Sequence, residues 1–259
     1  MSLSAIILTR NEAHNVEDCI ESLRWADSIL VFDSFSTDDT VNIAKSAGAR
    51  VEQRKFDSYT GQRNAALQTG GDEWVYFVDA DERSSHEQGL EIRKCTAAPE
   101  ISGYWVPRHN YIFGKLTRHT GWYPDYQLRL LRREKAHYDT SRDVHELVVL
   151  DGQAGYLQTP LVHYNYRDLA QFIDKQQRYT EFAARDLFRQ GIRVKPQNYI
   201  LQPLRHFRWR FLELQGYRDG IHGLRLSVLM SWYEYEKYVL LAKAWKQARA
   251  AGGGPSTTR

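Results

Sequence analysis

Cysteine is nearly absent from this sequence, with only Cys19 and Cys95 among 259 residues. Two cysteines so far apart exclude a disulfide framework and a cysteine-rich metal site, and they favour a reducing compartment. No apolar run approaches the roughly 20 residues that a membrane-spanning helix needs. The start of the chain lacks a basic segment before its first apolar run, so no signal peptide is expected. We therefore expect a cytoplasmic globular protein.

A glycine-rich phosphate loop with a lysine is also missing. The first apolar strand pattern is followed by Thr9-Arg10-Asn11-Glu12-Ala13-His14, which contains neither glycine nor lysine. A nucleotidyltransferase usually carries such a loop at this place, so this class of enzyme is disfavoured.

The net charge of +3 conceals an uneven distribution. Residues 160–259 carry 17 Lys and Arg against 8 Asp and Glu, a net charge of +9, and the rest of the chain carries 18 against 24, a net charge of −6. An acidic front half suits metal and nucleotide chemistry. A basic, aromatic back half suits an anionic surface, and a solvated basic helical face is the alternative.

Short apolar strand patterns alternate with helical patterns of about ten residues in the first third of the chain, which is typical of a parallel sheet covered on both faces. The expected strands are Ser4–Thr9, Ser28–Phe32, a short segment around Val51, and Trp74–Val78. The expected helices run from Asn11 to about Leu23, from about Asp38 to near Gly48, and from Thr60 to Leu67.

Polar residues stand at the carboxyl ends of these strands. They are Thr9 to Glu12 after the first strand, Asp33 and Ser34 after the second, and Asp79 and Asp81 after the fourth. In parallel sheets, ligands bind beyond the carboxyl ends of the strands. The sequence therefore predicts one crevice into which all three groups project.

Four motifs in this region resemble those of the family 2 glycosyltransferases, which are inverting enzymes of the GT-A fold. They are the opening strand with Thr9-Arg10-Asn11-Glu12, the segment Asp33-Ser34-Phe35-Ser36-Thr37-Asp38-Asp39-Thr40, the helix start Gly61-Gln62-Arg63-Asn64, and Asp79-Ala80-Asp81. Their order and spacing agree with the family over about the first 95 residues. Three later segments resemble the lipopolysaccharide core glucosyltransferase branch, namely Gln127 to Arg133, Val144-His145-Glu146, and Gly216 to Gly223.

The resemblance implies an α/β fold with a Rossmann-like nucleotide-sugar domain and a mostly parallel sheet. We expect a catalytic domain over residues 1–165, with a donor-binding half at 1–95 and an acceptor half at 96–165. A basic, aromatic helical region is expected at 166–249, with one helix over Leu169–Arg189, and a disordered tail at 250–259.

In the resembled family, the ends of the first two strands hold the uracil and ribose of a UDP-sugar, a role that carries over to Thr9, Asn11, Glu12 and Asp33. Carboxylates accept hydrogen bonds from base N–H groups and ribose hydroxyls. The alternatives are a helix cap for Asn11 and a turn for Asp33.

Arg63 is expected at the donor nucleotide or its phosphates, with an ordinary salt bridge as its alternative role.

A divalent cation, Mn²⁺ or Mg²⁺, is the expected cofactor. The resemblance makes Asp81 the first choice for direct ligation, with Asp79 supporting the ribose or the water shell of the metal. His163 is a further candidate for the metal or the diphosphate, and a hydrogen-bonded core histidine is the alternative. The cation would offset the charge that builds on the departing diphosphate.

Inversion needs a base that deprotonates the acceptor hydroxyl. The position of Glu146 in the branch motif favours it, followed by Asp143, and His145 would orient the carboxylate or the acceptor. The family often has two acids where this chain has His145-Glu146, so the sequence leaves the base open. Asp125, beside Trp122, is a candidate for acceptor hydroxyls, with core packing as the alternative for Trp122.

The basic and aromatic segment Arg205 to Arg210 has no accompanying nucleic-acid-binding signature, so no nucleic-acid partner is expected. An in-plane membrane helix or a lipid-phosphate site fits it better. The apolar stripe between Ile221 and Val239 has helical spacing, and it fits packing on the catalytic domain or a second copy equally well. Peripheral attachment to the inner face of the cytoplasmic membrane is therefore one predicted location.

The sequence thus predicts a metal-dependent inverting hexosyltransferase. It would use a UDP-sugar donor and a saccharide or lipid-linked acceptor in cell-envelope polysaccharide or lipopolysaccharide synthesis. The competing hypothesis is a non-catalytic nucleotide-sugar-binding or envelope-assembly module, which would share the crevice and need no base.

Overall fold

The computed structural model describes residues 1–140 and 147–250. It divides into two compact units. The sheet unit comprises residues 1–109 and 124–164, and the helical unit comprises residues 110–123 with the chain from 165 onward. The expected division into a catalytic domain over residues 1–165 and a helical region over 166–249 stays a prediction. Residues 110–123, expected in the acceptor half, are grouped with the helical unit. The expected disordered tail lies outside the described residues beyond Ala250.

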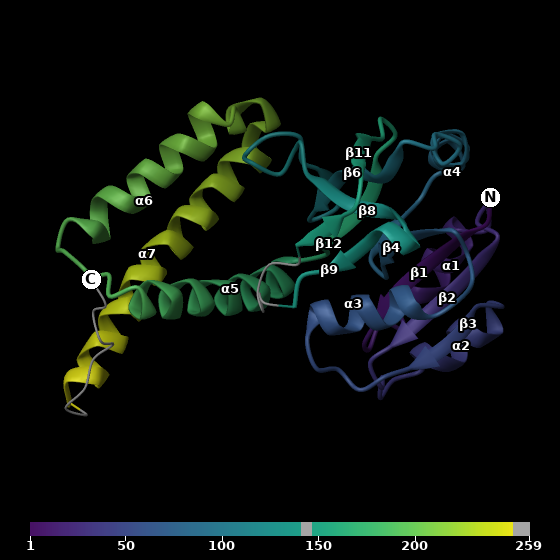
Figure 1. The fold of residues 1–259 in the computed structure, drawn as a ribbon. Helices are drawn as coiled ribbons and strands as arrows, with labels where there is room; N and C mark the ends of the chain where they lie inside the picture. The colour runs from purple at the N-terminus through teal and green to yellow at the C-terminus, as the bar shows by residue number, and fades with distance from the viewer. Residues whose placement is uncertain (141–146, 251–259) are drawn as a thin grey trace. The chain divides into compact units, whose positions relative to one another are not determined.

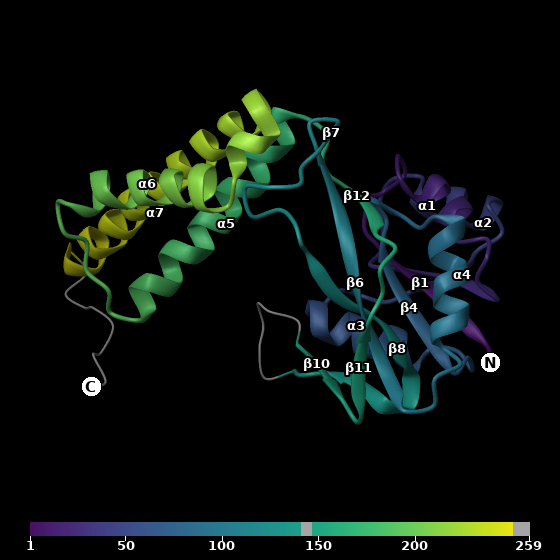
Figure 2. The ribbon, with the colours of Figure 1, turned by 90° about the horizontal axis from the view of Figure 1, so that it is seen from above.

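A mixed sheet forms the centre of the sheet unit (Figures 1 and 2). Its parallel part has the order β3-β2-β1-β4, and the sheet continues beyond β4 as β8-β6-β12-β5, with β8 antiparallel to both β4 and β6 and β5 antiparallel to β12. The parallel strands are β1 (Leu3–Thr9), β2 (Ser28–Asp33), β3 (Arg50–Gln53) and β4 (Trp74–Asp79). The strands that continue the sheet are β8 (Tyr126–Arg132), β6 (Ile101–Ile112), β12 (Leu161–Tyr166) and β5 (Glu82–Arg83), while β7 (Lys115–Leu116) and β11 (Gln153–Tyr156) pair with β6. The expected α/β class and the four leading strands are confirmed.

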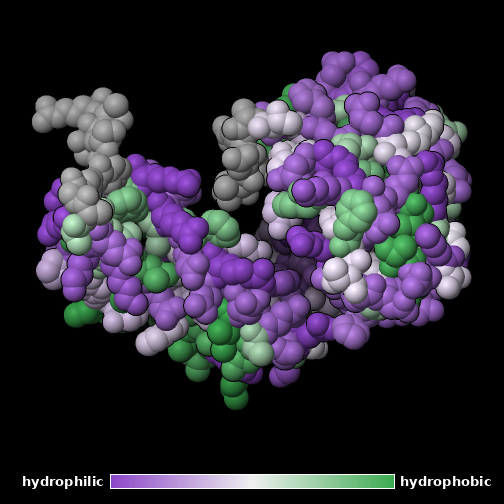
Figure 3. Space-filling view, turned by 90° about the horizontal axis from the view of Figure 1, so that it is seen from below, coloured by the Kyte–Doolittle hydropathy of each residue, from purple (hydrophilic) through white to green (hydrophobic). Residues whose placement is uncertain are grey.

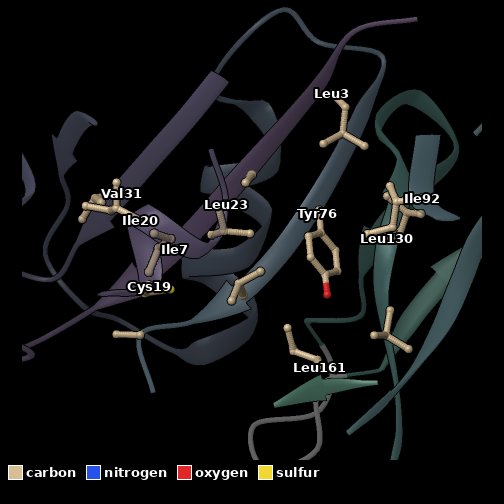
Figure 4. Packing of buried hydrophobic residues seen from close by; sticks show 14 of the residues in the cluster. Leu3, Ile7, Cys19, Ile20, Leu23, Val31, Tyr76, Ile92, Leu130 and Leu161 are labelled. Carbon is tan, nitrogen blue, oxygen red and sulfur yellow. The ribbon is translucent and has the colours of Figure 1, made fainter. Parts of the chain in front are cut away.

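Helices cover both faces of the parallel strands because these strands are apolar on both sides. On one face, α1 (Val16–Ser22), α2 (Thr40–Ser46) and α4 (His86–Cys95) contribute to a core that includes Ile7 and Val78. Figure 4 shows how Cys19 and Ile20 lie beside Ile7 in this core. On the other face, α3 (Tyr59–Gln68) and the hairpin of β9 (Ala136–Tyr138) and β10 (Val148–Leu150) pack on residues such as Ile6 and Phe77. The alternation of neighbouring residues between the two cores fixes the register of each strand.

The first helix starts later than expected, at Val16 instead of Asn11. Asn11 has a φ of 58°, a left-handed conformation that a helix cannot include. The amide of Asn11 donates to the Ser36 hydroxyl at 2.8 Å, and the amide of Ala13 donates to Asp38 at 3.1 Å. These side-chain acceptors hold the backbone in a loop, so Asn11 does not cap the helix. The N-cap residue is Asn15, the other candidate that the sequence offers, and its side chain makes no capping bond.

Three long segments build the helical unit: α5 (Leu169–Arg189), α6 (Asn198–Arg208) and α7 (Gly220–Ala250), with α7 packed against both α5 and α6. The expected bounds of α5 are confirmed, and its start is capped by Asp168, which accepts from the amide of Gln171. A π-helical turn, Trp209–Glu213, and a 3₁₀ turn, Gly216–Asp219, connect α6 to α7. No helix in the described residues is long and apolar enough to span a bilayer.

The Gly216 to Gly223 segment has a structural role within the helical unit. A Cβ atom on Gly223 would stand 1.9 Å from the carbonyl oxygen of Gly216, so only glycine fits there. Beside it, Asp219 accepts from both the amide and the ring Nδ1 of His119, at 2.9 and 2.8 Å. This segment therefore fastens residues 110–123 to the start of α7.

Candidate functional site

The carboxyl ends of the parallel strands are level with one another. Thr9 pairs with Asp33 in the register between β1 and β2, Asp33 pairs with Gln53, and Leu8 pairs with Asp79. Parallel pairing therefore brings the predicted strand-end residues to one edge of the sheet, which is where α/β sheets bind ligands.

Two loops at this edge are hydrogen-bonded to each other. The Asn11 side chain accepts from the amide of Thr37 at 2.8 Å, and the amide of Glu12 donates to the Thr40 hydroxyl at 2.8 Å. Together with the bonds to Ser36 and Asp38, these contacts join the loop after β1 to the loop after β2. The polar residues after β2 thus hold the neighbouring loop. Asp38 also accepts from the amide of Thr40, the first residue of α2, at 3.1 Å, while the N-cap residue Asp39 makes no side-chain capping bond.

Asp33 organises the end of β2. Its carboxylate is fully buried and accepts four hydrogen bonds. The donors are the Thr9 hydroxyl at 3.1 Å, the Ser36 amide at 2.9 Å and hydroxyl at 2.5 Å, and the Gln53 side chain at 2.9 Å. With two donors on each oxygen, Asp33 positions the loop in this structure, and its contact with uracil or ribose stays a prediction.

Asp79 lies between two buried arginines. Arg129 of β8 forms a bidentate pair with it, at 3.1 Å to Oδ1 and 2.5 Å to Oδ2, and Arg63 of α3 reaches Oδ1 at 3.3 Å. Arg63 also lies over the rings of Phe77 and Tyr138, 5.3 and 5.8 Å from their centres. The salt bridge that was the alternative for Arg63 is therefore present, and its partner is the first carboxylate of the Asp-Ala-Asp motif.

These arginines control the charge on Asp79. Burial by itself would raise the pKa of Asp79, but the positive charges of Arg129, Arg63 and Arg108 outweigh it, so the pKa lies well below its usual range. Burial likewise works to lower the pKa of Arg129, but Asp79 and Glu82 raise it well above its usual value. Asp79 is therefore ionised and already neutralised by protein cations, which makes it a poor direct metal ligand.

A buried carboxylate that the sequence did not single out, Glu82, extends this network. It accepts from the amide of Asp79 at 2.8 Å and from Arg108 at 3.2 Å, and it lies 3.7 Å from Arg129. Arg108 in turn pairs with Asp125 at 2.7 Å. Asp125, expected at acceptor hydroxyls, is thus an ion-pair partner here.

The signal that could have identified Arg129 was its place in the basic segment Gln127 to Arg133, where a charged side chain interrupts an apolar run. Glu82 carried a weaker signal, because it stands directly after Asp81 and begins a short strand.

Asp81 and His163 come together at this edge. Asp81 Oδ2 lies 3.6 Å from Nε2 of His163, and β5 pairs with β12 so that His163 is opposite Glu82. The amide of Tyr164 donates to the carbonyl of Asp81 at 2.9 Å, which fixes the backbone of the motif.

A carboxylate and an imidazole suit Mn²⁺ or a similar divalent cation. Residues 1–140 and 147–250 contain no group of three His, Cys, Asp or Glu side chains that could hold a metal by themselves. Asp81 and His163 therefore fit a cation that takes its remaining ligands from substrate phosphates and water, as is usual for hard cations at nucleotide sites. Asp79, with both oxygens engaged by Arg129, would act from outside the coordination shell.

The predicted base residues Asp143, His145 and Glu146 lie outside the described residues. Trp122 is partly buried and packs against the core of the helical unit, where its ring centre lies 5.8 Å from that of Tyr166. The core-packing alternative for Trp122 is therefore confirmed.

Comparison with known proteins identifies the family of this chain. The model of "Glycosyl transferase family 2" matches residues 4–161. The lipopolysaccharide core biosynthesis glycosyltransferase LpsC of Rhizobium meliloti (strain 1021) is 30% identical over 94% of this chain and 95% of its own length. An uncharacterized glycosyltransferase of Rickettsia bellii (strain RML369-C) is 31% identical over 76% of this chain and 70% of its own.

Among solved structures, mannosyl-3-phosphoglycerate synthase from Rubrobacter xylanophilus is similar with a TM-score of 0.48 and 18% identity, over 76% of this chain and 77% of that one. The family match covers more than half of the chain and includes all four motifs named in the sequence analysis. The chain is therefore a glycosyltransferase of family 2, with the GT-A fold.

Proposed function

We propose that this enzyme transfers a hexose, with inversion, from a UDP-sugar to a saccharide or lipid-linked acceptor in lipopolysaccharide core or related envelope polysaccharide synthesis. The observation that carries the proposal is the level row of strand ends, where the Asp81–His163 pair stands next to the Asp79–arginine cluster. The relative LpsC, which is named for lipopolysaccharide core biosynthesis, supports the acceptor class.

The residues divide into a nucleoside region and a phosphate region. Thr9, Asn11 and Glu12 form the nucleoside side with the loop that Asp33 holds in place. Arg63 and Asp79 stand between the two regions.

On the phosphate side, Asp81 and His163 would hold a divalent cation, which when bound supplies positive charge to the departing diphosphate. Asp79, kept ionised by Arg63 and Arg129, would orient the ribose or water of the cation's shell. Arg63 and Arg129 keep this carboxylate from competing with the diphosphate for the metal.

UDP should stabilise the protein against heat only when Mn²⁺ is present. A ligand that binds the folded state alone raises its stability by about 2.7 kcal/mol at a concentration one hundred times its Kd. Thermal unfolding with UDP, with Mn²⁺, with both, and with both plus EDTA measures this coupling. GDP with Mn²⁺ is the matched control for recognition of the uracil nucleobase. A shift of the same size with UDP and EDTA would contradict a cation shared by Asp81 and the diphosphate.

Glu146 is proposed as the base that deprotonates the acceptor hydroxyl, with Asp143 as the second candidate and His145 as its orienting neighbour. Replacing Glu146 by glutamine removes the proton acceptor and keeps the shape of the side chain. We expect the turnover number to fall by about 100- to 10,000-fold while UDP binding is unchanged.

Asp143→Asn is the matched control for Glu146→Gln, with an expected smaller loss. Near-normal turnover of Glu146→Gln alongside a large loss in Asp143→Asn would move the role to Asp143. A protein that neither transfers nor hydrolyses any donor in a panel of nucleotide sugars would instead be a binding module.

A further inference from the structure

Exposed apolar side chains are concentrated in the helical unit. Of the 24 large hydrophobic residues that are exposed among the described residues, 15 lie between Leu169 and Trp232. Isolated exposed hydrophobic residues are normal on protein surfaces, but a concentration of them marks an interaction site.

The most regular group lies on one face of α7. Ile221, Leu224, Val228 and Trp232 follow one another at spacings of three, four and four residues, and Ile221 is 86% exposed. This spacing places them on the face opposite Leu226 and Tyr233, which are buried in the core of the helical unit.

The helix that packs on α7 adds to this group. Ile200 and Leu204 of α6 are 64% and 59% exposed, and the turn that follows presents further apolar side chains. Figure 3 shows hydrophobic side chains projecting at the lower edge of the view, where the turn between α6 and α7 lies. We call the whole set the apolar surface, and its members are Ile200, Leu201, Leu204, Trp209, Leu212, Ile221, Leu224, Val228 and Trp232.

Arginines are interspersed with these residues. Arg205, Arg208, Arg218 and Arg225 are all exposed on the same stretch of chain. Residues 198–232 contain five arginines, two acids and no lysine. One of these acids, Glu213, lies 3.3 Å from Arg208, and the other, Asp219, is engaged by His119. The stretch therefore has a surplus of positive charge next to exposed leucine, isoleucine and tryptophan.

We propose that this surface docks, in the plane of the membrane, on a bilayer that contains anionic lipid. Anionic headgroups complement the arginines, and the apolar side chains enter the boundary between headgroups and acyl chains. Tryptophan is enriched at that boundary. A second copy of the chain would satisfy the apolar side chains but would place arginines against arginines. The inference is independent of the donor chemistry, because it concerns residues of the helical unit only.

Co-sedimentation of the full chain with vesicles tests the proposal. We expect strong binding to vesicles of equimolar phosphatidylcholine and phosphatidylglycerol, and weak binding to phosphatidylcholine alone. Each of Arg208→Gln and Arg225→Gln should lower the partition coefficient about fivefold on anionic vesicles. Ile221→Asp combined with Val228→Asp should abolish binding, because charged groups then stand at the centre of the apolar surface.

Three controls separate docking from general effects. Leu90→Asp replaces a residue that is 58% exposed on α4, and Arg185→Gln replaces an exposed arginine on α5; neither should change vesicle binding. The UDP-induced thermal shift should be the same in all variants, which shows that a failure of docking is distinct from a failure of the donor site.

Unchanged vesicle binding by Ile221→Asp with Val228→Asp would overturn the proposal. So would a dimer in analytical ultracentrifugation that this double variant converts to a monomer, if the normal protein does not bind vesicles.

Discussion

Asp81→Asn is expected to lower the catalytic efficiency of sugar transfer about a thousandfold, equivalent to about 4 kcal/mol of transition-state stabilisation. Asparagine keeps the volume of the side chain but removes the negative charge that would balance the cation. His163, 3.6 Å away, would then be the remaining protein ligand of the Asp81–His163 pair. The cation's affinity should therefore fall together with the rate. Steady-state kinetics across a series of Mn²⁺ concentrations measures both effects.

Asp18→Asn is the matched control for this change. Asp18 lies on α1, and its side chain is 77% exposed. Its carboxylate lies 3.6 Å from the guanidinium of Arg83, which is two residues after Asp81. We expect its loss to leave transfer within about twofold of normal, because an exposed ion pair contributes little. If Asp81→Asn retains normal kinetics and the same dependence on Mn²⁺, Asp81 is not a ligand of a catalytic metal.

His163→Asn separates the two members of the pair. Imidazole is a neutral ligand, so its removal leaves the charge balance of the cation unchanged. We expect a weaker effect than for Asp81→Asn, seen mainly as a higher Mn²⁺ requirement. The order of the two effects therefore tests whether the carboxylate is the principal ligand.

Local patterns were sufficient to predict the parallel strands and the level of their ends. In β4, the apolar run from Trp74 stops at Asp79, and this change of polarity marks where a buried strand meets solvent. The bounds of α5 could also be predicted from local signals, because Asp168 caps its start and Gly191, with a φ of 73°, follows its end.

The ion-pair network could not be predicted in the same way. Arg129 and Asp79 are 50 residues apart, and their contact depends on β8 pairing antiparallel with β4. Sequence patterns show that Arg129 interrupts an apolar strand, but they do not show which carboxylate it meets. The late start of α1 also depends on contacts between distant segments. Ser36 and Thr40 accept hydrogen bonds from the loop before α1, and the sequence around α1 does not show these contacts.

The network also leads to the second large expected effect, which is on stability. Glu82→Ala should destabilise the sheet unit by about 3–5 kcal/mol, the usual cost of removing one partner from a buried ion pair. Glu82 is fully buried, and its loss would leave Arg108 with Asp125 alone, Arg129 with Asp79 alone, and the amide of Asp79 without its acceptor. Thermal and urea unfolding measure the change.

Glu21→Ala is the control for this change, because Glu21 pairs with Arg24 on an exposed part of α1 and should cost less than about 1 kcal/mol. Glu82→Gln keeps an oxygen acceptor for the amide of Asp79 but removes the charge, so its cost should fall between those of the other two variants. Equal stability of Glu82→Ala and Glu21→Ala would contradict the prediction, because it would show that Arg108 and Arg129 replace Glu82 with water or other acceptors. If the expected order holds, Glu82 stabilises the turn that carries Asp81, and the charge of Glu82 helps to hold the proposed metal ligand in place.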